Sequence, residues 1–276
     1  MSPLVFAVVL GAAAIHAGWN AIVKLGRDAR LSTVLVAGTA ALIALAALPL
    51  LPPVAPAAWP YLALSGALEV GYYALVAAAY GAADMSRAYP LMRGTPPLLV
   101  ALVSVAALGT SLSPAAWLGI GLISAGLAGL ALAGRGGNAR GTLFALANGL
   151  VIASYTLVDG LGVRLSGAPV TYTMWVFLLS GAPVVAWALL RRPDTLAYLR
   201  DNWPLGLAGG IGTLASYGLV LWAMTQAPVP LVAALRETSI LFGAAIAALL
   251  LREKVSLTRL AAILVVAAGA ILLRLA

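Results

Sequence analysis

Long apolar stretches, separated by short breaks that hold charged residues, proline or glycine, fill almost the whole sequence. A helix needs about 20 mostly apolar residues to cross a bilayer. Ten stretches of suitable length are present: 4–23, 31–51, 58–80, 89–109, 115–133, 141–161, 170–190, 204–225, 230–251 and 257–275. The apolar runs are continuous, which excludes the alternating pattern of a membrane β-barrel. The sequence therefore predicts an all-α membrane protein with ten transmembrane helices.

Composition indicates that lipid surrounds most of the chain. Of its 276 residues, 63% are hydrophobic and 9% are charged, whereas soluble domains carry roughly 25% charged residues. The longest connection runs from Arg191 to Trp203 and is too short for a soluble domain. We therefore predict a single membrane domain over residues 1–276. Met1 begins a segment without a basic region, so no secretory signal peptide is expected.

The two halves of the chain share a pattern in their third and fourth spans. Tyr73 opens Tyr-Ala-Leu-Val-Ala-Ala-Ala, and Tyr217 opens Tyr-Gly-Leu-Val-Leu-Trp-Ala; further on, Arg93-Gly94-Thr95 aligns with Arg236-Glu237-Thr238. Each half holds five spans, an odd number, so the second half must lie inverted relative to the first. Transporters commonly place a site at the interface of such repeats. We predict repeat one at 1–136 and repeat two at 137–276, around a central cavity.

Positive charge is unevenly divided between the two sides of the predicted membrane domain. Thirteen of the 16 Lys and Arg residues fall at the ends of the odd-numbered spans: Lys24, Arg27, Arg30, Arg87, Arg93, Arg135, Arg140, Arg191, Arg192, Arg200, Arg252, Lys254 and Arg259. The other side has Arg164, Arg236 and Arg274. Because loops rich in Lys and Arg stay in the cytoplasm, this bias places both termini outside it. The scattered charges favour contact with anionic lipid over nucleic-acid binding, for which we expect no role.

Polar residues inside the spans are few, and each marks a candidate for function. An ionisable group in a span costs about 2.5–3.5 kcal/mol on insertion scales and usually belongs to a pathway. Glu69, Tyr73 and Tyr80 follow one face of the third span. The full set of candidate substrate-binding residues is His16, Trp19, Asn20, Glu69, Tyr73, Tyr80, Arg93, Tyr155, Asp159, Tyr217, Arg236 and Glu237.

Several of these residues also have a structural interpretation. His16 suits a hydrogen-bonded core histidine, Asp159 lies near a span end and can reach the interface, and Arg236 next to Glu237 suits an ion pair. Pro96-Pro97 and Pro228/Pro230 are expected to interrupt helical hydrogen bonding near the arginines. Gly121, Ala125 and Gly129 predict close helix packing. Ten helices in a monomer are sufficient to enclose a cavity, and a dimer is the alternative oligomeric state.

The candidate residues combine the two poles of a zwitterion. An arginine fork binds the two oxygens of a carboxylate or phosphate, and a glutamate with tyrosine faces suits an ammonium group. An amino acid is the simplest zwitterion, and a protonatable Glu69 suggests coupling to protons. The chain has no cysteine, a single histidine and no phosphate-binding G-x-x-x-x-G-K-[ST] loop. We therefore expect a transporter without metal or cofactor, and not an enzyme or an ATP-driven pump.

The whole chain resembles the EamA-like, ten-helix members of the drug/metabolite transporter superfamily. The resemblance rests on the two five-helix halves, on His16-Ala-Gly-Trp19-Asn20-Ala-Ile-Val-Lys24, and on Leu251-Arg-Glu253-Lys254. Among these proteins it is similar to YddG-type amino acid exporters. The resemblance implies export of neutral or aromatic amino acids through the cytoplasmic membrane of a bacterial-type cell. It also implies a central cavity lined by spans 1, 3, 4, 6, 8 and 9, and alternating access by rocking of the repeats.

The sequence departs from that family pattern at two points. The resemblance implies cytoplasmic termini, opposite to the charge count. In addition, Trp19-Asn20 and the paired Arg-x-Thr segments resemble a branch whose members move phosphonates or other organic anions. Two arginines suit such a cargo as well as an amino acid carboxylate, so an organic anion is the alternative substrate.

Overall fold

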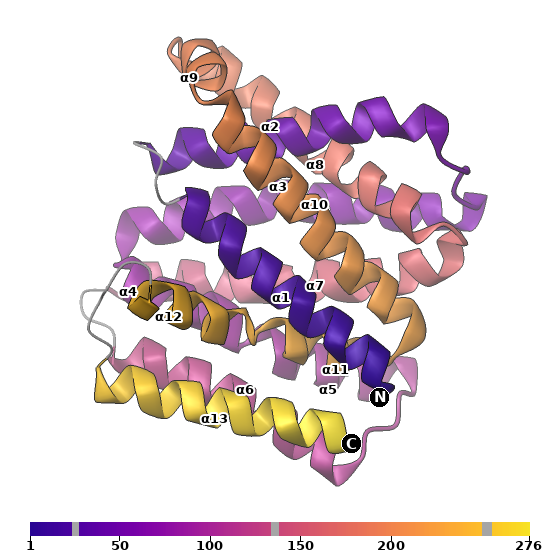
Figure 1. The fold of residues 1–276 in the computed structure, drawn as a ribbon, viewed down its shortest axis with the longest axis vertical. Coiled ribbons are helices and arrows are strands. Elements are labelled where there is room, and N and C mark those ends of the chain that lie inside the picture. The colour runs from indigo at the N-terminus through magenta and orange to yellow at the C-terminus, as the bar shows by residue number, and fades with distance from the viewer. Residues whose placement is uncertain (24–27, 134–137, 250–255) are drawn as a thin grey trace.

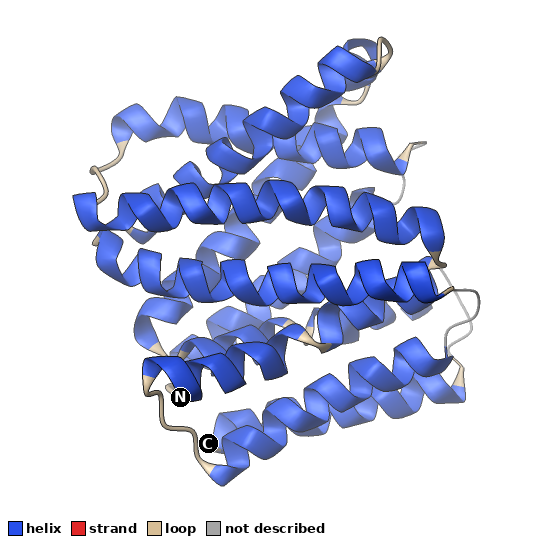
Figure 2. Ribbon diagram, turned by 180° about the vertical axis from the view of Figure 1, so that it is seen from behind, coloured by secondary structure: helices blue, strands red, loops and turns tan. Residues whose placement is uncertain are grey.

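The structure is a computed structural model that describes residues 1–23, 28–133, 138–249 and 256–276. Within these residues it consists of helices and loops, without a strand (Figure 2). Ten helical segments of the described residues are long and apolar enough to cross a membrane. The all-α fold with ten transmembrane helices is thereby confirmed.

The predicted spans correspond closely to observed helices. The first half contains α1 (Pro3–Val23), α2 (Ala29–Ala47), η1 (Leu48–Leu50), η2 (Pro56–Ala58), α3 (Trp59–Ala82), α4 (Met85–Gly94), α5 (Pro96–Leu108) and α6 (Pro114–Ala133). The second half contains α7 (Ala139–Ser166), α8 (Pro169–Arg191), α9 (Thr195–Asp201), α10 (Trp203–Gln226), α11 (Val229–Arg236), α12 (Ser239–Leu249) and α13 (Leu257–Leu275). The repeat boundary, Lys24 and the Leu251–Lys254 segment lie outside the described residues.

The fourth and ninth spans are each broken into two helices. The first break falls at Thr95, directly before the prolines that begin α5, as the sequence predicted. The second falls at Glu237 and Thr238, between α11 and α12. Here the prediction from proline was wrong, because Pro230 stands in the first turn of α11, where a missing N–H breaks no helical bond.

The helices pack in a reciprocal pattern between the two halves. The third span of each half lies against the first span of the other, α3 on α7 and α10 on α1 (Figure 1). The second spans, α2 and α8, contact each other, and so do the last spans, α6 and α13. In Figure 1 the α6–α13 pair lies at one end of the molecule and α9 near the other. Exchanging the halves reproduces each of these contacts.

Asp28, the residue directly before α2, connects this helix to the segment between α8 and α9. Asp28 caps α2 by accepting hydrogen bonds from the backbone N–H of Arg30 at 2.8 Å and of Leu31 at 3.0 Å. Arg192 pairs with Asp28 at 3.3 Å. These backbone donors, Leu31 first, together with Arg192, hold the pKa of Asp28 below its usual value. The connection between α8 and α10 is thus attached to the first half of the chain.

Close helix contact in the α6–α13 pair occurs at glycines other than those predicted. A Cβ added to Gly269 would meet the backbone oxygen of Gly119 at 2.7 Å, whereas one added to Gly121 or Gly129 would meet no atom within 4 Å. The predicted pattern of Gly121, Ala125 and Gly129 therefore lies on a different face of α6 from its contact with α13. Gly121 and Ala125 instead line an apolar groove of about 210 Å³ between α6 and the α4–α5 break.

Candidate functional site

Two helix breaks bring three charged side chains together inside the helix bundle. Arg93 lies in the last turn of α4, and Arg236 is the last residue of α11. Glu237, which follows α11, approaches Arg93 with an Nε–Oε2 distance of 2.8 Å and Arg236 with an Nε–Oε1 distance of 3.6 Å. All three are buried, with exposed fractions of 8%, 5% and 2% for Arg93, Arg236 and Glu237. We call these residues the arginine–glutamate cluster.

The arginine–glutamate cluster is only partly satisfied. Arg93 Nη2, Arg236 Nε and Glu237 Oε1 are buried and make no hydrogen bond. The 2.8 Å contact between Arg93 and Glu237 is an ion pair whose N–H is not aligned for hydrogen bonding. Buried polar atoms are nearly always paired, so each exception requires an explanation. Here the unpaired guanidinium atoms can bind the oxygens of an anionic group.

The two carboxylates nearest this cluster have different surroundings. Asp159 on α7 is fully buried and accepts hydrogen bonds from the hydroxyls of Tyr172 at 3.0 Å and Tyr217 at 2.5 Å. It does not reach the interface, because α7 continues to Ser166. Glu69 on α3 is 8% exposed and interacts electrostatically with Asp159 and Arg236. Asp159 therefore holds tyrosines of α8 and α10, while Glu69 interacts with both Asp159 and Arg236.

Aromatic rings extend in a row beside the charged residues. Tyr73 and Tyr72 have ring centroids 5.3 Å apart, and Tyr72 lies 6.1 Å from Tyr155. Tyr155 lies 6.5 Å from Tyr217, which lies 5.9 Å from Phe177. These edge-to-face contacts are a favourable geometry for aromatic pairs. The row provides a wall of ring faces and edges from four helices.

The sequence did not indicate Tyr72, Tyr172 or Phe177 as site residues. Tyr172 and Phe177 belong to α8, whose span carries no charged residue in its interior. Tyr72 directly follows Gly71 and precedes Tyr73, so helical geometry turns it about 100° from its predicted neighbour. The only sequence signal was the local density of tyrosine in α3.

The predicted residues of α1 are divided between the cluster and their own helix. His16 interacts electrostatically with Arg93 and Arg236, and its ring lies 5.2 Å from that of Trp19. Trp19 packs against Gly212 of α10 and has a buried indole Nε1 without a hydrogen-bond partner. The amide nitrogen of Asn20 donates to the carbonyl oxygen of His16 at 2.8 Å. Asn20 thus uses this amide group within α1.

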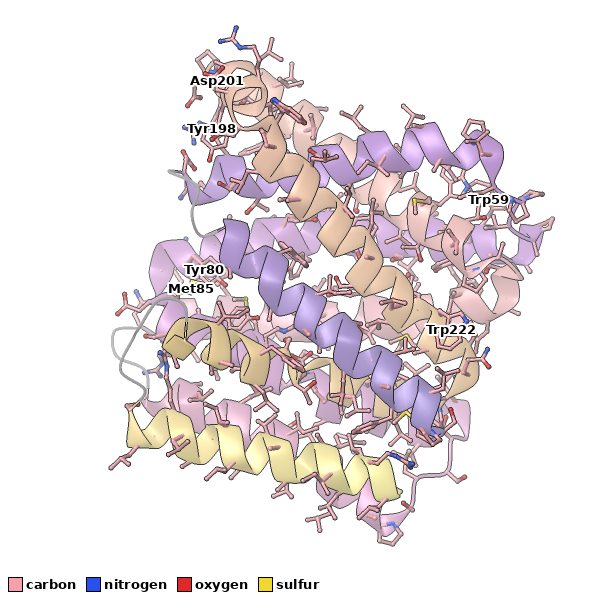
Figure 3. All side chains as sticks on the ribbon, in the orientation of Figure 1. Trp59, Tyr80, Met85, Tyr198, Asp201 and Trp222 are labelled. Carbon is pink, nitrogen blue, oxygen red and sulfur yellow. The ribbon has the colours of Figure 1, made fainter. Side chains whose placement is uncertain are left out.

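Tyr80 is the most exposed of the candidate residues. It is 37% exposed near the end of α3. Figure 3 shows it at the same edge of the molecule as Met85, across from Trp59 and Trp222. The structure therefore brings Arg93, Arg236 and Glu237 together at the two helix breaks. His16 and Glu69 interact electrostatically with these arginines, and Tyr80, near the end of α3, interacts electrostatically with Arg93.

A pocket of about 230 Å³ is located where α5 and α7 end and α11 begins. Its arginine, Arg164, donates hydrogen bonds to the carbonyl oxygens of Met224 and Ala227, both at 2.7 Å. Arg164 therefore caps the last turn of α10, a favourable position for a cation at the negative end of a helix. Among the described residues, no group of three His, Asp or Glu side chains is placed to hold a metal ion.

Fold and site together define a multi-pass membrane protein with ionisable residues buried among its helices. Residues 139–275 match the model of the EamA-like transporter family, so the second half of the chain is an EamA-like domain. This match supports membership of the drug/metabolite transporter superfamily and suggests a membrane transporter of small solutes. Because the matched family is one of transporters, the match favours transport over an enzymatic activity.

Structural similarity extends over both halves. A solved crystal structure, described only as that of a protein, aligns with a TM-score of 0.75 and 20% sequence identity. The alignment covers 99% of this chain and 96% of the other. At this identity the likeness concerns the fold alone. No curated protein matches the sequence.

Proposed function

We propose that the protein exports neutral or aromatic amino acids across the cytoplasmic membrane by alternating access. The observation that carries this proposal is the pair of buried arginines whose guanidinium atoms Arg93 Nη2 and Arg236 Nε have no hydrogen-bond partner. A carboxylate supplies acceptor oxygens with the geometry that a guanidinium fork prefers. The arginines therefore form the carboxylate pole of the binding site.

Glu69 forms the opposite pole of the proposed site. Its carboxylate is buried on α3 and interacts electrostatically with Arg236. An ammonium group gains from a carboxylate and from nearby tyrosine faces, such as those of Tyr73 and Tyr155. The row of aromatic rings also offers an apolar surface to the substrate's side chain. Asp159 contributes indirectly, because its oxygens accept the hydroxyls of Tyr172 and Tyr217.

Alternating access requires two parts that move around the site. We assign these parts to repeat one, 1–136, and repeat two, 137–276. The reciprocal contacts between the first and third spans of the two halves support this division. So do the helix breaks, because Thr95 and Thr238 occupy aligned positions at the two breaks. Inverted repeats of this kind rock around a fixed site near the midplane of the membrane.

Counterflow in proteoliposomes tests the proposal. Vesicles loaded with unlabelled L-phenylalanine or L-leucine should accumulate the labelled amino acid from outside in a saturable manner. Arg236→Gln and Glu69→Gln should each lower this uptake at least about tenfold, because a hydrogen bond to a charged group contributes about 1.5–3 kcal/mol. Arg200→Gln is the matched control, since its side chain is 79% exposed on α9. Uptake that is unchanged in both site variants would refute the assigned poles.

An organic anion such as a phosphonate is the second candidate substrate. The observation that favours it is the presence of two buried arginines against the single carboxylate of Glu237 in the same cluster. A phosphonate carries more negative charge than a carboxylate and can engage both guanidinium groups. Counterflow of labelled methylphosphonate, with no uptake of any amino acid, would favour this candidate over amino acid export.

A further inference from the structure

Glu237 occupies an unusual position for a residue that binds substrate. Its carboxylate lies between two guanidinium groups, with nitrogen–oxygen distances of 2.8 Å to Arg93 and 3.6 Å to Arg236. Only 2% of the residue is exposed. An ammonium group arriving at Glu237 would meet the positive charge of both arginines. Glu237 is therefore poorly placed to bind the cationic end of a solute, whereas Glu69 has no arginine within ion-pair distance among the described contacts.

The same carboxylate stands where an anionic group of a solute would bind. Its Oε1 atom makes no hydrogen bond, and the nearby Arg93 Nη2 and Arg236 Nε atoms are also unpaired. A partly satisfied buried network is less stable than one in which each atom has a partner. A free carboxylate or phosphonate that engaged both arginine forks would satisfy more of these atoms than Glu237 does.

Glu237 also joins the two halves of the chain. Arg93 lies at the end of α4, just before the break at Thr95. Glu237 is itself part of the break between α11 and α12. The ion pair thus connects the broken span of the first half to the broken span of the second. Separating Glu237 from Arg93 therefore removes an ion pair that connects the two helix breaks.

We propose that Glu237 is an internal counter-ion, which neutralises Arg93 in the empty transporter and is displaced when the solute's anionic group binds. This inference rests on the proposed function in one respect, the binding of an anionic group at Arg93 and Arg236. Binding then exchanges one carboxylate for another on the guanidinium of Arg93. The apparent affinity for anions is lowered, because only the fraction of protein with an unpaired arginine is competent to bind. The exchange also releases the contact between the two helix breaks.

The affinity of purified protein for 3-phenylpropionate, a carboxylate without an ammonium group, tests this competition directly. Glu237→Gln removes the competing charge and keeps the side-chain size, so titration calorimetry should show 3-phenylpropionate binding at least about tenfold more tightly than to wild type. Glu237→Asp withdraws the carboxylate from Arg93 but keeps the charge, and it should give a smaller gain. It also serves if Glu237→Gln does not fold. Asp194→Asn, which removes an exposed carboxylate paired with Arg192, is the matched control and should not alter the affinity.

Unchanged or weaker binding of 3-phenylpropionate in the Glu237 variants would overturn the inference. Phenethylamine, the ammonium counterpart, provides the opposite check: loss of a charge that neutralises Arg93 should not favour a cation, so tighter phenethylamine binding to Glu237→Gln would also overturn the inference. The outcome is separable from amino acid export. If Glu237→Gln binds the anion more tightly but the protein transports no amino acid, the counter-ion role of Glu237 stands and the proposal of amino acid export fails. If the protein shows amino acid counterflow but Glu237→Gln has unaltered anion affinity, amino acid export stands and the counter-ion role of Glu237 fails.

Discussion

At the scale of single residues, the roles of the buried carboxylates are set by their partners rather than by their charge. Asp159 has a tyrosine hydroxyl on each oxygen, which fixes the side chains of Tyr172 and Tyr217 on two other helices. Gly162 makes room for this arrangement, because a Cβ there would collide with the ring and hydroxyl of Tyr172. Asp159 therefore acts as a positioning residue for the aromatic row.

Removing one of these hydroxyls tests the role of Asp159. Tyr217→Phe leaves an oxygen of the fully buried Asp159 without its donor, and an unsatisfied buried acceptor costs about 1–3 kcal/mol. The midpoint of thermal unfolding in detergent should fall accordingly. Tyr80→Phe removes a hydroxyl from a tyrosine that is 37% exposed, and it should leave the midpoint nearly unchanged. An equal effect of the two variants would show that the Asp159 network does not stabilise the fold.

The sequence indicated where buried ionisable residues lie in the spans better than it indicated their contacts. Glu69, Arg93 and Arg236 were recognisable because ionisable residues are so scarce in these spans. The partner of Arg93 was not, because Glu237 comes from the other half of the chain and no local spacing connects them. Tyr172 was missed for the same reason: its significance depends on Asp159, which reaches it through tertiary packing.

At the scale of helices, the apolar pattern determined the spans and left their interruptions less certain. Hydropathy averages over a whole turn or more, so it located each span within a few residues of its observed bounds. The break at Thr95 was predicted because prolines follow it. The break at Glu237 carries no proline or glycine, and it coincides with the buried ion pair instead. Glycine spacing on α6 predicted close packing at Gly121 and Gly129, whereas the close contact with α13 is at Gly119, because small residues occur on both sides of this helix.

The contact between α6 and α13 provides a test at this scale. Gly269→Ala places a methyl group 2.7 Å from the backbone oxygen of Gly119, and backbone cannot move aside as a side chain can. Overpacking of this kind typically costs about 1–3 kcal/mol, so the thermal midpoint should fall. Gly121→Ala, on the same pair of helices but in open space, should leave it unchanged or slightly higher. A stable Gly269→Ala variant would indicate that the two helices are not held this closely.

At the scale of the whole molecule, the reciprocal helix contacts and the charge distribution bear on different questions. The contacts support two related halves, and they are independent of which side of the membrane is which. The charge distribution addresses orientation. The loop around α9 carries Arg191, Arg192 and Arg200 on the side where the odd-numbered spans end. In Figure 1 both chain termini lie at the other side. The positive-inside rule therefore predicts a cytoplasmic α9 loop and termini on the outside.

This orientation can be measured with single cysteines, because the chain has none of its own. Asp201→Cys reports the α9 side (Figure 3). Ser111→Cys reports the exposed loop between α5 and α6, where an even-numbered span ends and which therefore lies on the opposite side. In cells with a permeabilised outer membrane, a membrane-impermeant maleimide should label the cysteine at 111, and should label that at 201 only after the inner membrane is disrupted. The reverse pattern would place the termini in the cytoplasm, as in the transporters that the sequence resembles. It would also mean that most of the basic residues at the ends of the odd-numbered spans face outward against the usual bias, so retention of charge on that side would need a role other than topology.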